Sequence, residues 1–242
     1  MNAQNINNME SQSNYYISSV NDGNIALHTS LSALEAQQNR AAIAAKLGFS
    51  VHKLVSMQQV HQANVHIVDS QDAGKGSQDW DSALPQTDGL VTNVRGLVLL
   101  AQGADCPLLL FHDKKMSVIG VAHAGWKGVV AGIAIKMLET MHQAFNCHLE
   151  DIEITIAPHA GACCYEVSQD FIPNFSAFPP EVFILRNRKL FLDLDRALVW
   201  QLTQNAVKHI NLLDICTICS NDYFSFRREK DRAGRFGLFA WL

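Results

Sequence analysis

Three segments of the chain carry residue types that bind transition metals in proteins. They are centred on His61, Cys106 and His123, and each lies where an apolar, strand-like run begins or ends. The gaps are long, 45 residues from His61 to Cys106 and 17 from Cys106 to His123, whereas structural zinc sites use ligand pairs about two to five residues apart. Because loops at strand ends deliver side chains into a common pocket, the pattern predicts a site assembled by the fold.

Two imidazoles and one thiolate would together form a coordination site for a transition metal ion. Three such ligands leave the fourth tetrahedral position of zinc for water or substrate, which is the arrangement of a catalytic zinc ion. The same donors also suit copper. Taken singly, however, each residue is better explained by core or loop packing, because ten histidines and six cysteines form many triples. Residue types and spacing alone therefore leave both explanations open.

The other five cysteines predict free thiols. Cys216 and Cys219 form a single C-x-x-C, and a zinc ribbon needs a second such pair. We therefore expect these two to be buried strand cysteines rather than metal ligands. A chain of this length has its own core and needs no disulfides, and the adjacent Cys163 and Cys164 do not suit an ordinary disulfide framework. This usage predicts a reducing, cytoplasmic location.

Composition excludes several classes of partner. The 242 residues are 48% hydrophobic and 17% charged, which is enough for a sizeable core and gives no sign of disorder. A net charge of −4 predicts no nucleic-acid or anionic-membrane partner. No stretch reaches the ~18 apolar residues that span a bilayer. Residues 1–15 are rich in Asn, Gln and Ser and lack a basic, apolar block, so we expect a flexible tail and no signal peptide.

Residue patterning predicts the order of the elements. A helix is expected at 34–47, with capping-box spacing of Ser32 and Glu35 at its start and Gly48 at its end. Four uniformly apolar runs between Gly89 and Ala122 predict central strands covered on both faces. The other expected elements are strands at 53–60, 64–69 and 152–156, a long loop at 70–86, a helix of about twenty residues reaching Asn146, a helix at 194–209, and a terminal strand pair at 217–227 and 237–242.

Helices and strands thus alternate irregularly, with hairpins as well as crossovers. This order favours an α/β (α+β) layered sandwich with a mixed central sheet. A Rossmann fold is not expected, because no G-x-G-x-x-G opens a helix after a strand, and there is no Walker phosphate loop. The sequence has no internal repeat and no convincing linker, so residues 1–242 are expected to form a single domain.

The sequence around the three ligand candidates resembles one bacterial family. That family was first described as laccase-like or polyphenol oxidase proteins and later as purine nucleoside phosphorylases with additional nucleoside activities. The resemblance implies that His61, Cys106 and His123 bind zinc and that the substrates are a purine nucleoside and phosphate. The matching stretches run in the family's order from about residue 39 to the C-terminus: Gln59–His61, Thr87–Gly89, Ala104–Pro107, Ala122–Gly128, Cys163–Val167, Phe224–Arg228 and Gly234–Arg235.

The resemblance also implies a reaction. Phosphate would cleave the N-glycosidic bond of adenosine, inosine, guanosine or methylthioadenosine through a transition state with oxocarbenium character at the sugar. Zinc would orient phosphate or lower the pKa of a water molecule, and the same water could attack C6 of adenine and so deaminate adenosine.

Two departures from the family bear on the substrate. Ala157 stands where glycine is usual and His159 where cysteine is common. The Phe-Ser-Thr-Arg segment that opens many members has no clear match in residues 1–30. Either other residues make the contacts of that segment here, or the substrate range differs.

Phosphate requires local positive charge, and the C-terminal region supplies the densest basic group. Arg227, Arg228 and Arg235 could hold phosphate in bidentate fashion, and Arg227 is also a catalytic candidate. The acidic and basic residues between them also fit a solvated face of a C-terminal hairpin, an alternative that is weaker for Arg227 than for Arg235.

Four further residues each have a chemical and a structural explanation. Asp105 could orient the neighbouring ligand or act as a general acid or base, or it could cap a strand end. Asp88 could act similarly or bind substrate, although a turn-forming Asp-Gly explains it more simply. His159 could be a proton donor in the pocket or a plain loop histidine. Trp126 could stack on a purine, with core packing as the simpler explanation.

Three other functions stay open. A copper-dependent phenol oxidase is disfavoured, because a trinuclear copper cluster is fed by many histidines, typically as His-x-His pairs, and the chain has no His-x-His. Zinc could instead support amide hydrolysis of a cell-wall precursor with a misincorporated amino acid, an activity associated with some relatives. A non-catalytic module with a structural metal ion, or none, is the third. The resemblance also allows a homodimer, although no apolar stripe in the sequence demands one.

Overall fold

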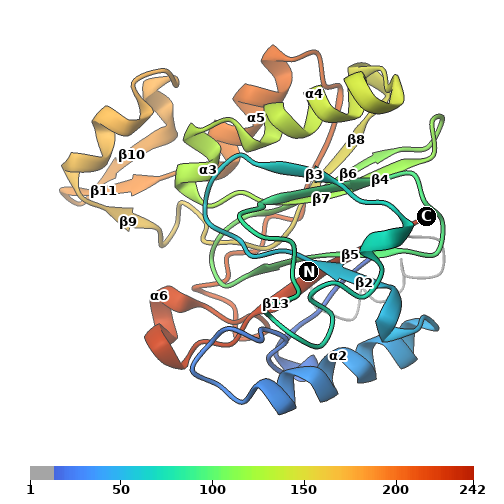
Figure 1. Cartoon of the computed structure of the whole chain (residues 1–242). Helices are drawn as coiled ribbons and strands as arrows, with labels where there is room; N and C mark the ends of the chain where they lie inside the picture. The colour runs from blue at the N-terminus through green and yellow to red at the C-terminus, as the bar shows by residue number, and fades with distance from the viewer. Residues whose placement is uncertain (1–13) are drawn as a thin grey trace.

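Two β-sheets packed face to face, with helices on both outer faces, form the body of the protein (Figure 1). The computed structural model describes residues 14–242. Helices α4 and α5 lie over one sheet and α2 lies under the other, which gives four layers. In the described residues the α-helices are α2 (Ala33–Leu47), α3 (Trp126–Val130), α4 (Ile133–Phe145), α5 (Leu194–Gln204) and α6 (Phe226–Glu229).

The strands build one six-stranded, one four-stranded and one small three-stranded sheet. The six-stranded sheet has the order β12 (His209–Leu212), β8 (Glu153–Ile156), β6 (Leu108–Asp113), β7 (Val118–His123), β4 (Gly89–Thr92), β3 (Val65–Ile67). The four-stranded sheet has the order β1 (Tyr15–Ile17), β13 (Phe236–Trp241), β5 (Val98–Gly103), β2 (Leu54–Ser56), and the small sheet the order β10 (Phe183–Arg186), β11 (Lys189–Leu192), β9 (Glu166–Val167).

Both large sheets are mixed. In the six-stranded sheet β12 runs parallel to β8 and β3 parallel to β4, while the inner pairs are antiparallel. In the four-stranded sheet β2 is parallel to β5, and β13 is antiparallel to both of its neighbours. The predicted layered sandwich with a mixed sheet, and without a Rossmann topology, is therefore confirmed.

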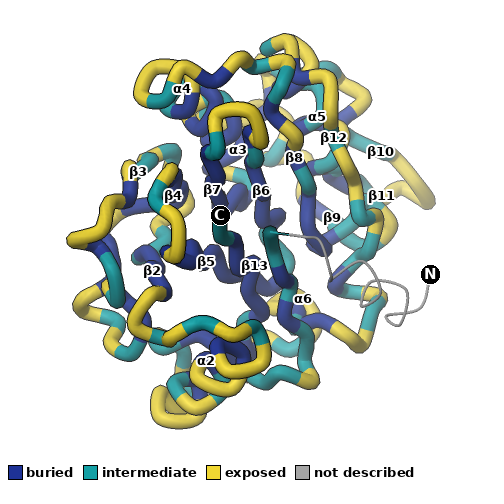
Figure 2. The backbone as a smooth tube through the Cα atoms, turned by 90° about the vertical axis from the view of Figure 1, so that its right-hand side faces the viewer, coloured by how far each residue is buried: buried dark blue, intermediate teal, exposed yellow. Residues whose placement is uncertain are grey.

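Strand β7 explains why the central runs are apolar throughout. Ile119 and Val121 face the core between the two sheets, whereas Val118 and Ala122 belong to the core beneath α4. A strand covered on both faces has no solvent side on which polar residues could alternate. The same holds for β5, which lies between the inter-sheet core and the core over α2, and Figure 2 shows this buried centre between α4 and α2.

The N-terminal elements follow their sequence signals. Helix α2 starts where the Ser32 hydroxyl accepts a hydrogen bond from the Glu35 amide, and it ends at Gly48, whose φ of 78° is left-handed. On its inner face the fully buried Arg40 donates to the carbonyls of Ile25, Gly76 and Ser77. This one side chain thus ties the N-terminal segment and the long loop after β3 to the helix.

Three expectations about the elements were wrong in part. The long helix reaching Asn146 is divided into α3 and α4, because Gly132 takes a left-handed conformation with φ of 81°. The helix expected at 194–209 ends at Gln204, and His209–Leu212 form β12, since pairing with β8 overrides local helix preference. The strand expected at 217–227 is a loop leading into α6, so the basic residues there do not lie on a hairpin.

The expected tail and the C-x-x-C pair also need correction. Residues 1–13 of the predicted tail lie outside the described residues, but Tyr15 already belongs to β1, which pairs with β13. Cys216 and Cys219 are not buried strand cysteines, because they lie in the loop between β12 and α6, where Cys219 is exposed. Within residues 14–242, no helix combines the length and apolarity needed to cross a membrane.

Candidate metal centre

His61, Cys106 and His123 come together as the sequence predicted. Their donor atoms all lie within 4.8 Å of one another. The His61 Nε2 atom is 3.9 Å from the Cys106 Sγ atom, and the two imidazole rings meet edge to face with centroids 4.7 Å apart. His123 ends β7, His61 lies between β2 and β3, and Cys106 lies between β5 and β6. Two of the three ligand candidates therefore lie where the chain passes from one large sheet to the other.

The donor set fits a transition metal such as zinc. Zinc–nitrogen and zinc–sulfur bonds of about 2.0–2.3 Å at tetrahedral angles place neighbouring donors about 3.4–3.6 Å apart. The observed 3.9 Å between His61 Nε2 and Cys106 Sγ needs only a small side-chain adjustment. Two imidazoles and one thiolate leave a fourth position open, as a catalytic site requires.

Asp88 holds this arrangement together. Its buried carboxylate accepts hydrogen bonds from the successive backbone amides of Val60, His61 and Gln62, at 3.2, 3.0 and 2.9 Å. Such a cluster of amides forms a concave anion site, and it supports the left-handed φ of 60° at His61. The same carboxylate lies 2.9 Å from Nδ1 of His123, which leaves Nε2 to face a metal ion. Burial raises the pKa of Asp88, but the bonds from His123 and the amides lower it below its usual value.

Cys106 and His123 stabilise each other's charged forms. Burial opposes ionisation of both groups, but attraction to His123 lowers the pKa of Cys106 to about 6. Attraction to Cys106 and the hydrogen bond to Asp88 raise the pKa of His123 to about 9. At neutral pH the thiolate needed for metal binding is therefore already favoured.

Asp88→Asn is expected to weaken metal binding at this centre by roughly 10- to 100-fold, the usual cost of losing the hydrogen-bond partner of a ligating histidine. The amide lacks the negative charge that orients His123, and its NH₂ group would oppose the backbone amides. Competition with a chromophoric chelator measures the affinity. Asp81→Asn, an exposed carboxylate in the preceding loop, is the matched control. Equal affinities of the two variants would contradict the role given to Asp88.

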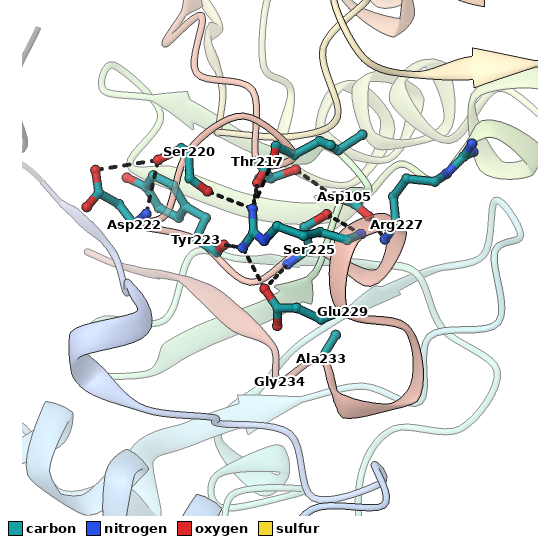
Figure 3. Close-up of polar contacts among 12 residues, drawn as sticks. Asp105, Thr217, Ser220, Asp222, Tyr223, Ser225, Arg227, Glu229, Ala233 and Gly234 are labelled. Atoms are coloured by element: carbon teal, nitrogen blue, oxygen red, sulfur yellow. Dashed lines mark hydrogen bonds and ion pairs between the residues drawn. The ribbon is translucent and has the colours of Figure 1, made fainter.

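Asp105 connects the centre to α6. It has a left-handed φ of 88°, and its carboxylate accepts from the Thr217 hydroxyl at 2.7 Å and from the Arg227 backbone amide at 2.6 Å. Figure 3 shows Asp105 between these two residues. The residue that precedes the ligand candidate Cys106 thus sets the position of the helix that carries Arg227.

The three candidate arginines differ in how far their donors are used. Arg228 donates to the carbonyls of Thr217, Ile218, Ser220 and Tyr223 and to the Glu229 carboxylate, so both of its terminal nitrogens are occupied. The exposed Arg227 donates from Nη1 to the Glu166 carbonyl at 2.8 Å and lies over the Tyr165 ring. Its Nη2 and Nε, like those of Arg235, have no hydrogen bond within residues 14–242.

Arg228→Ala is expected to destabilise the fold by about 3 kcal/mol, because several carbonyls would lose a charged donor at a side chain that is only 29% exposed. For a chain of this size that corresponds to a melting temperature lower by roughly 6–12 °C. Differential scanning calorimetry measures it. Arg227→Ala, the adjacent residue with one such bond, is the control and should change the melting temperature much less.

The side chains of His159 and Trp126 contact residues other than the three metal-ligand candidates. The buried His159 bonds through Nδ1 to the Ala157 carbonyl and lies 3.4 Å from Asp195 through Nε2. It lines a cleft of about 710 Å³ whose other walls include Cys163 and Cys216 but none of the three ligand candidates. Trp126 begins α3 and packs against Phe171, with ring centroids 4.8 Å apart, beside the core under α4.

Two residues near the centre were missed by the sequence analysis. Thr217 holds Asp105 from inside the C-x-x-C segment, and no local motif marks it. His28 stacks on Trp80 with centroids 4.2 Å apart, and desolvation followed by the positive charge of Arg235 lowers the pKa of His28 to about 4. Thr217 and His28 each contact a residue that is distant in the sequence, and patterns within a single sequence do not reveal such contacts.

These features define a class of protein. It is an α/β sandwich of two sheets with a group of two histidines and one cysteine near the points where the chain crosses between the sheets, and a buried carboxylate orients one of the histidines. The family model described as multi-copper polyphenol oxidoreductase laccase matches residues 9–242, and the chain belongs to that family.

Named relatives agree with this assignment. The chain is 33% identical over 224 residues to the purine nucleoside phosphorylase YlmD of Geobacillus stearothermophilus, covering 89% of this chain and 82% of the relative. It is 31% identical over 201 residues to the human purine nucleoside phosphorylase LACC1, covering 80% of this chain and 44% of that protein. The crystal structure of YlmD from G. stearothermophilus matches with a TM-score of 0.86 at 32% identity, covering 90% of this chain and 84% of that one. The resemblance and the fold predicted from sequence are thereby confirmed.

Proposed function

We propose that this protein is a zinc-dependent purine nucleoside phosphorylase that cleaves adenosine, inosine, guanosine or methylthioadenosine with phosphate. The observation that carries the proposal is the convergence of His61, Cys106 and His123 next to Asp105, which binds the backbone of Arg227. Relatives named purine nucleoside phosphorylases, one of them 33% identical, support the reaction class. Because all six cysteines are free thiols, we place the reaction in a reducing compartment such as the cytoplasm.

Each residue of the centre has its own role in binding and orienting a metal ion. When bound, zinc supplies a Lewis acid that stabilises negative charge on an oxygen of phosphate or water. Asp88 keeps the proton of His123 on Nδ1 and so presents Nε2 inward. Cys106 contributes the thiolate, which His123 stabilises before metal binding. The centre thus has three fixed donors and one open side for a substrate oxygen.

Arg227 and Arg235 are the groups that we assign to phosphate. Each has guanidinium nitrogens without a hydrogen bond in the described residues, and burial lowers the pKa of Arg235 while Cys106 and Asp105 counteract this from nearby. Phosphate held there would lie beside the metal, where its negative charge stabilises the oxocarbenium character of the sugar. Arg228 is occupied by carbonyls, and we therefore assign it to the fold.

Asp105 is given a positioning role. Its carboxylate is committed to Thr217 and to the Arg227 amide, so it places the phosphate-binding arginine. We assign His159 no part in the reaction, because its side chain lines the cleft that includes Cys163 and Cys216 and none of the three ligand candidates.

The test is turnover of purified protein with adenosine, inosine, guanosine and methylthioadenosine, each with and without phosphate, followed by chromatography and mass detection. Free base and sugar 1-phosphate that form only with phosphate are expected. Inosine formed from adenosine without phosphate would add the deaminase activity that an activated water allows. Nucleosides left intact would overturn the proposal and favour amide hydrolysis of a cell-wall precursor or a non-catalytic role.

Phenol oxidation, which the family's description suggests, is not the proposed activity. A multicopper oxidase needs a trinuclear cluster with many histidines. Within residues 14–242, the groups whose geometry suits a metal ion contain two histidines in all, His61 and His123. Oxygen consumption with a phenol and copper, in place of nucleoside turnover, would contradict this choice.

Arg227→Ala is expected to raise the KM for phosphate by roughly 10- to 100-fold, because a hydrogen bond to a charged group contributes about 1.5–3 kcal/mol. The KM for the nucleoside should change much less. Steady-state kinetics with each substrate varied in turn separates the two. Arg232→Ala, an exposed arginine three residues before Arg235, serves as control and should leave both KM values unchanged. Equal increases in both KM values would argue against phosphate binding by Arg227.

A further inference from the structure

A second group of metal-binding residue types lies outside the centre described above. The Sγ atoms of Cys163, Cys164, Cys216 and Cys219 all lie within 4.8 Å of one another. Cys219 is 3.0 Å from Cys164 and 3.5 Å from Cys163, and all four are free cysteines. The C-x-x-C segment has no second cysteine pair near it in the sequence, but the fold brings Cys163 and Cys164 next to it.

The backbone brings these two pairs to the same place. Cys163 and Cys164 lie in the loop from β8 to β9, and Cys216 and Cys219 lie in the loop from β12 to α6. Because β8 and β12 are parallel neighbours, both loops leave the same end of the sheet. Two backbone bonds hold the loops in register, from the His159 amide to the Ile215 carbonyl at 3.1 Å and from the Thr217 amide to the His159 carbonyl at 2.9 Å.

The sulfur positions fit a tetrahedral metal ion. With zinc–sulfur bonds of about 2.3 Å, neighbouring sulfurs of a four-cysteine site lie about 3.8 Å apart. The contacts of 3.0 and 3.5 Å are somewhat shorter than that spacing and the remaining pairs lie inside 4.8 Å, so small side-chain adjustments would reach it. The Gly161 amide donates to the Cys216 Sγ at 3.3 Å, which favours a thiolate. A Cβ atom at Gly161 would lie 3.1 Å from the Cys216 Cβ and 3.4 Å from the Cys163 Sγ, so the missing side chain lets the backbone approach the sulfurs.

Positive charge lies around the cluster. Four thiolates and one zinc ion carry a net charge of −2, which neighbouring cations would stabilise. Arg186 donates to the Cys163 carbonyl at 2.7 Å, and Arg228 donates to the Thr217, Ile218 and Ser220 carbonyls around the C-x-x-C turn. Both guanidinium groups therefore bind the backbone of the two cysteine segments.

We propose that Cys163, Cys164, Cys216 and Cys219 bind a second, structural zinc ion. Four thiolates complete a tetrahedral coordination sphere and leave no position for substrate, in contrast to the three-ligand centre. The ion would join the β8–β9 loop to the loop that carries Thr217. Since Thr217 binds Asp105 and Asp105 binds the Arg227 amide, this zinc ion would fix the loop that holds Asp105 and, through it, Arg227.

The test counts zinc by elemental mass spectrometry in protein purified from zinc-supplemented cells without chelators and with a reductant. Two zinc ions per chain are expected in the unaltered protein, and one in Cys106→Ala, which leaves the four-cysteine group intact. One ion is also expected in the double variant Cys216→Ser/Cys219→Ser, and two in Cys147→Ala, whose thiol lies outside both groups. One zinc ion in the unaltered protein, absent from Cys106→Ala, would overturn the proposal.

Cobalt substitution gives a second readout that leaves the four cysteines unchanged. In Cys106→Ala the His61–His123 pair retains no thiolate, so intense thiolate-to-cobalt charge-transfer absorption can arise only from another cysteine site. Its presence at one cobalt per chain is expected. Its absence, or a Cys164–Cys219 disulfide found by peptide mapping after purification under reducing conditions, would contradict zinc binding. Neither readout depends on nucleoside turnover, so this proposal and the proposed enzymatic activity can fail separately.

Discussion

Cys106→Ala is expected to lower kcat/KM for nucleoside phosphorolysis by on the order of 10³, because a catalytic metal ion contributes several kcal/mol of transition-state stabilisation. The variant should also lose one metal ion per chain. Cys106 is the only thiolate of the three-ligand centre, and its Sγ lies 3.9 Å from the Nε2 of His61. Two imidazoles alone would hold zinc much more weakly, so activity and metal content should fall together.

The measurement pairs steady-state kinetics with elemental analysis on the same preparation. Cys147→Ala controls for loss of a thiol elsewhere, because Cys147 is buried at the end of α4 and belongs to neither metal-ligand group. Excess zinc in the assay should restore Cys106→Ala only in part. Full activity with full zinc content in Cys106→Ala would defeat the assignment of the centre.

Gly125→Ala should nearly abolish metal binding although no donor atom is removed. A Cβ atom at Gly125 would lie 2.6 Å from the Cδ2 atom of His61, 3.2 Å from the Cys106 sulfur and 3.5 Å from Cε1 of His123. Gly125 has a φ of −56°, which alanine adopts without strain. Since His61 lies at the surface, its ring can turn aside at little cost to the fold, but it then leaves the metal.

The two consequences can be measured separately. Thermal unfolding of the metal-free proteins should differ by less than about 1 kcal/mol, since alanine at a compatible φ is neutral or slightly stabilising. Metal affinity and kcat/KM should fall by at least about 100-fold, because the displaced ligand cannot share the coordination sphere. Unchanged metal affinity in a folded Gly125→Ala protein would show that the three side chains do not bind one ion.

The convergence of His61, Cys106 and His123 could be predicted because each lies near the end or the start of a strand-like run. The runs around Leu99 and Val121 are apolar throughout, which predicts strands that are covered on both faces. The polar residues that follow these runs were therefore expected at the ends of the strands. The resemblance then selected His61, Cys106 and His123 from many triples.

Contacts between distant segments were not predictable in the same way. The hydrogen bond from His123 to the Asp88 carboxylate spans 35 residues, and the contact of Cys164 with Cys219 spans 55. Neither leaves a periodic signal, and Asp88-Gly89 reads locally as a turn. Likewise, β12 forms at His209–Leu212 because β8 offers an unpaired edge, which is a property of the sheet and not of those four residues.

The placement of His61 and Cys106 between the two sheets has a consequence for when a metal ion could bind at this centre during biosynthesis. Strand β5, which precedes Cys106, is flanked by β2 and by β13, which lies far behind β5 in the sequence. A nascent chain therefore lacks a neighbour of β5 until β13 has been synthesised. High-affinity metal loading should accordingly follow the synthesis of β13, when both sheets have formed and the three donors are held at their final separations.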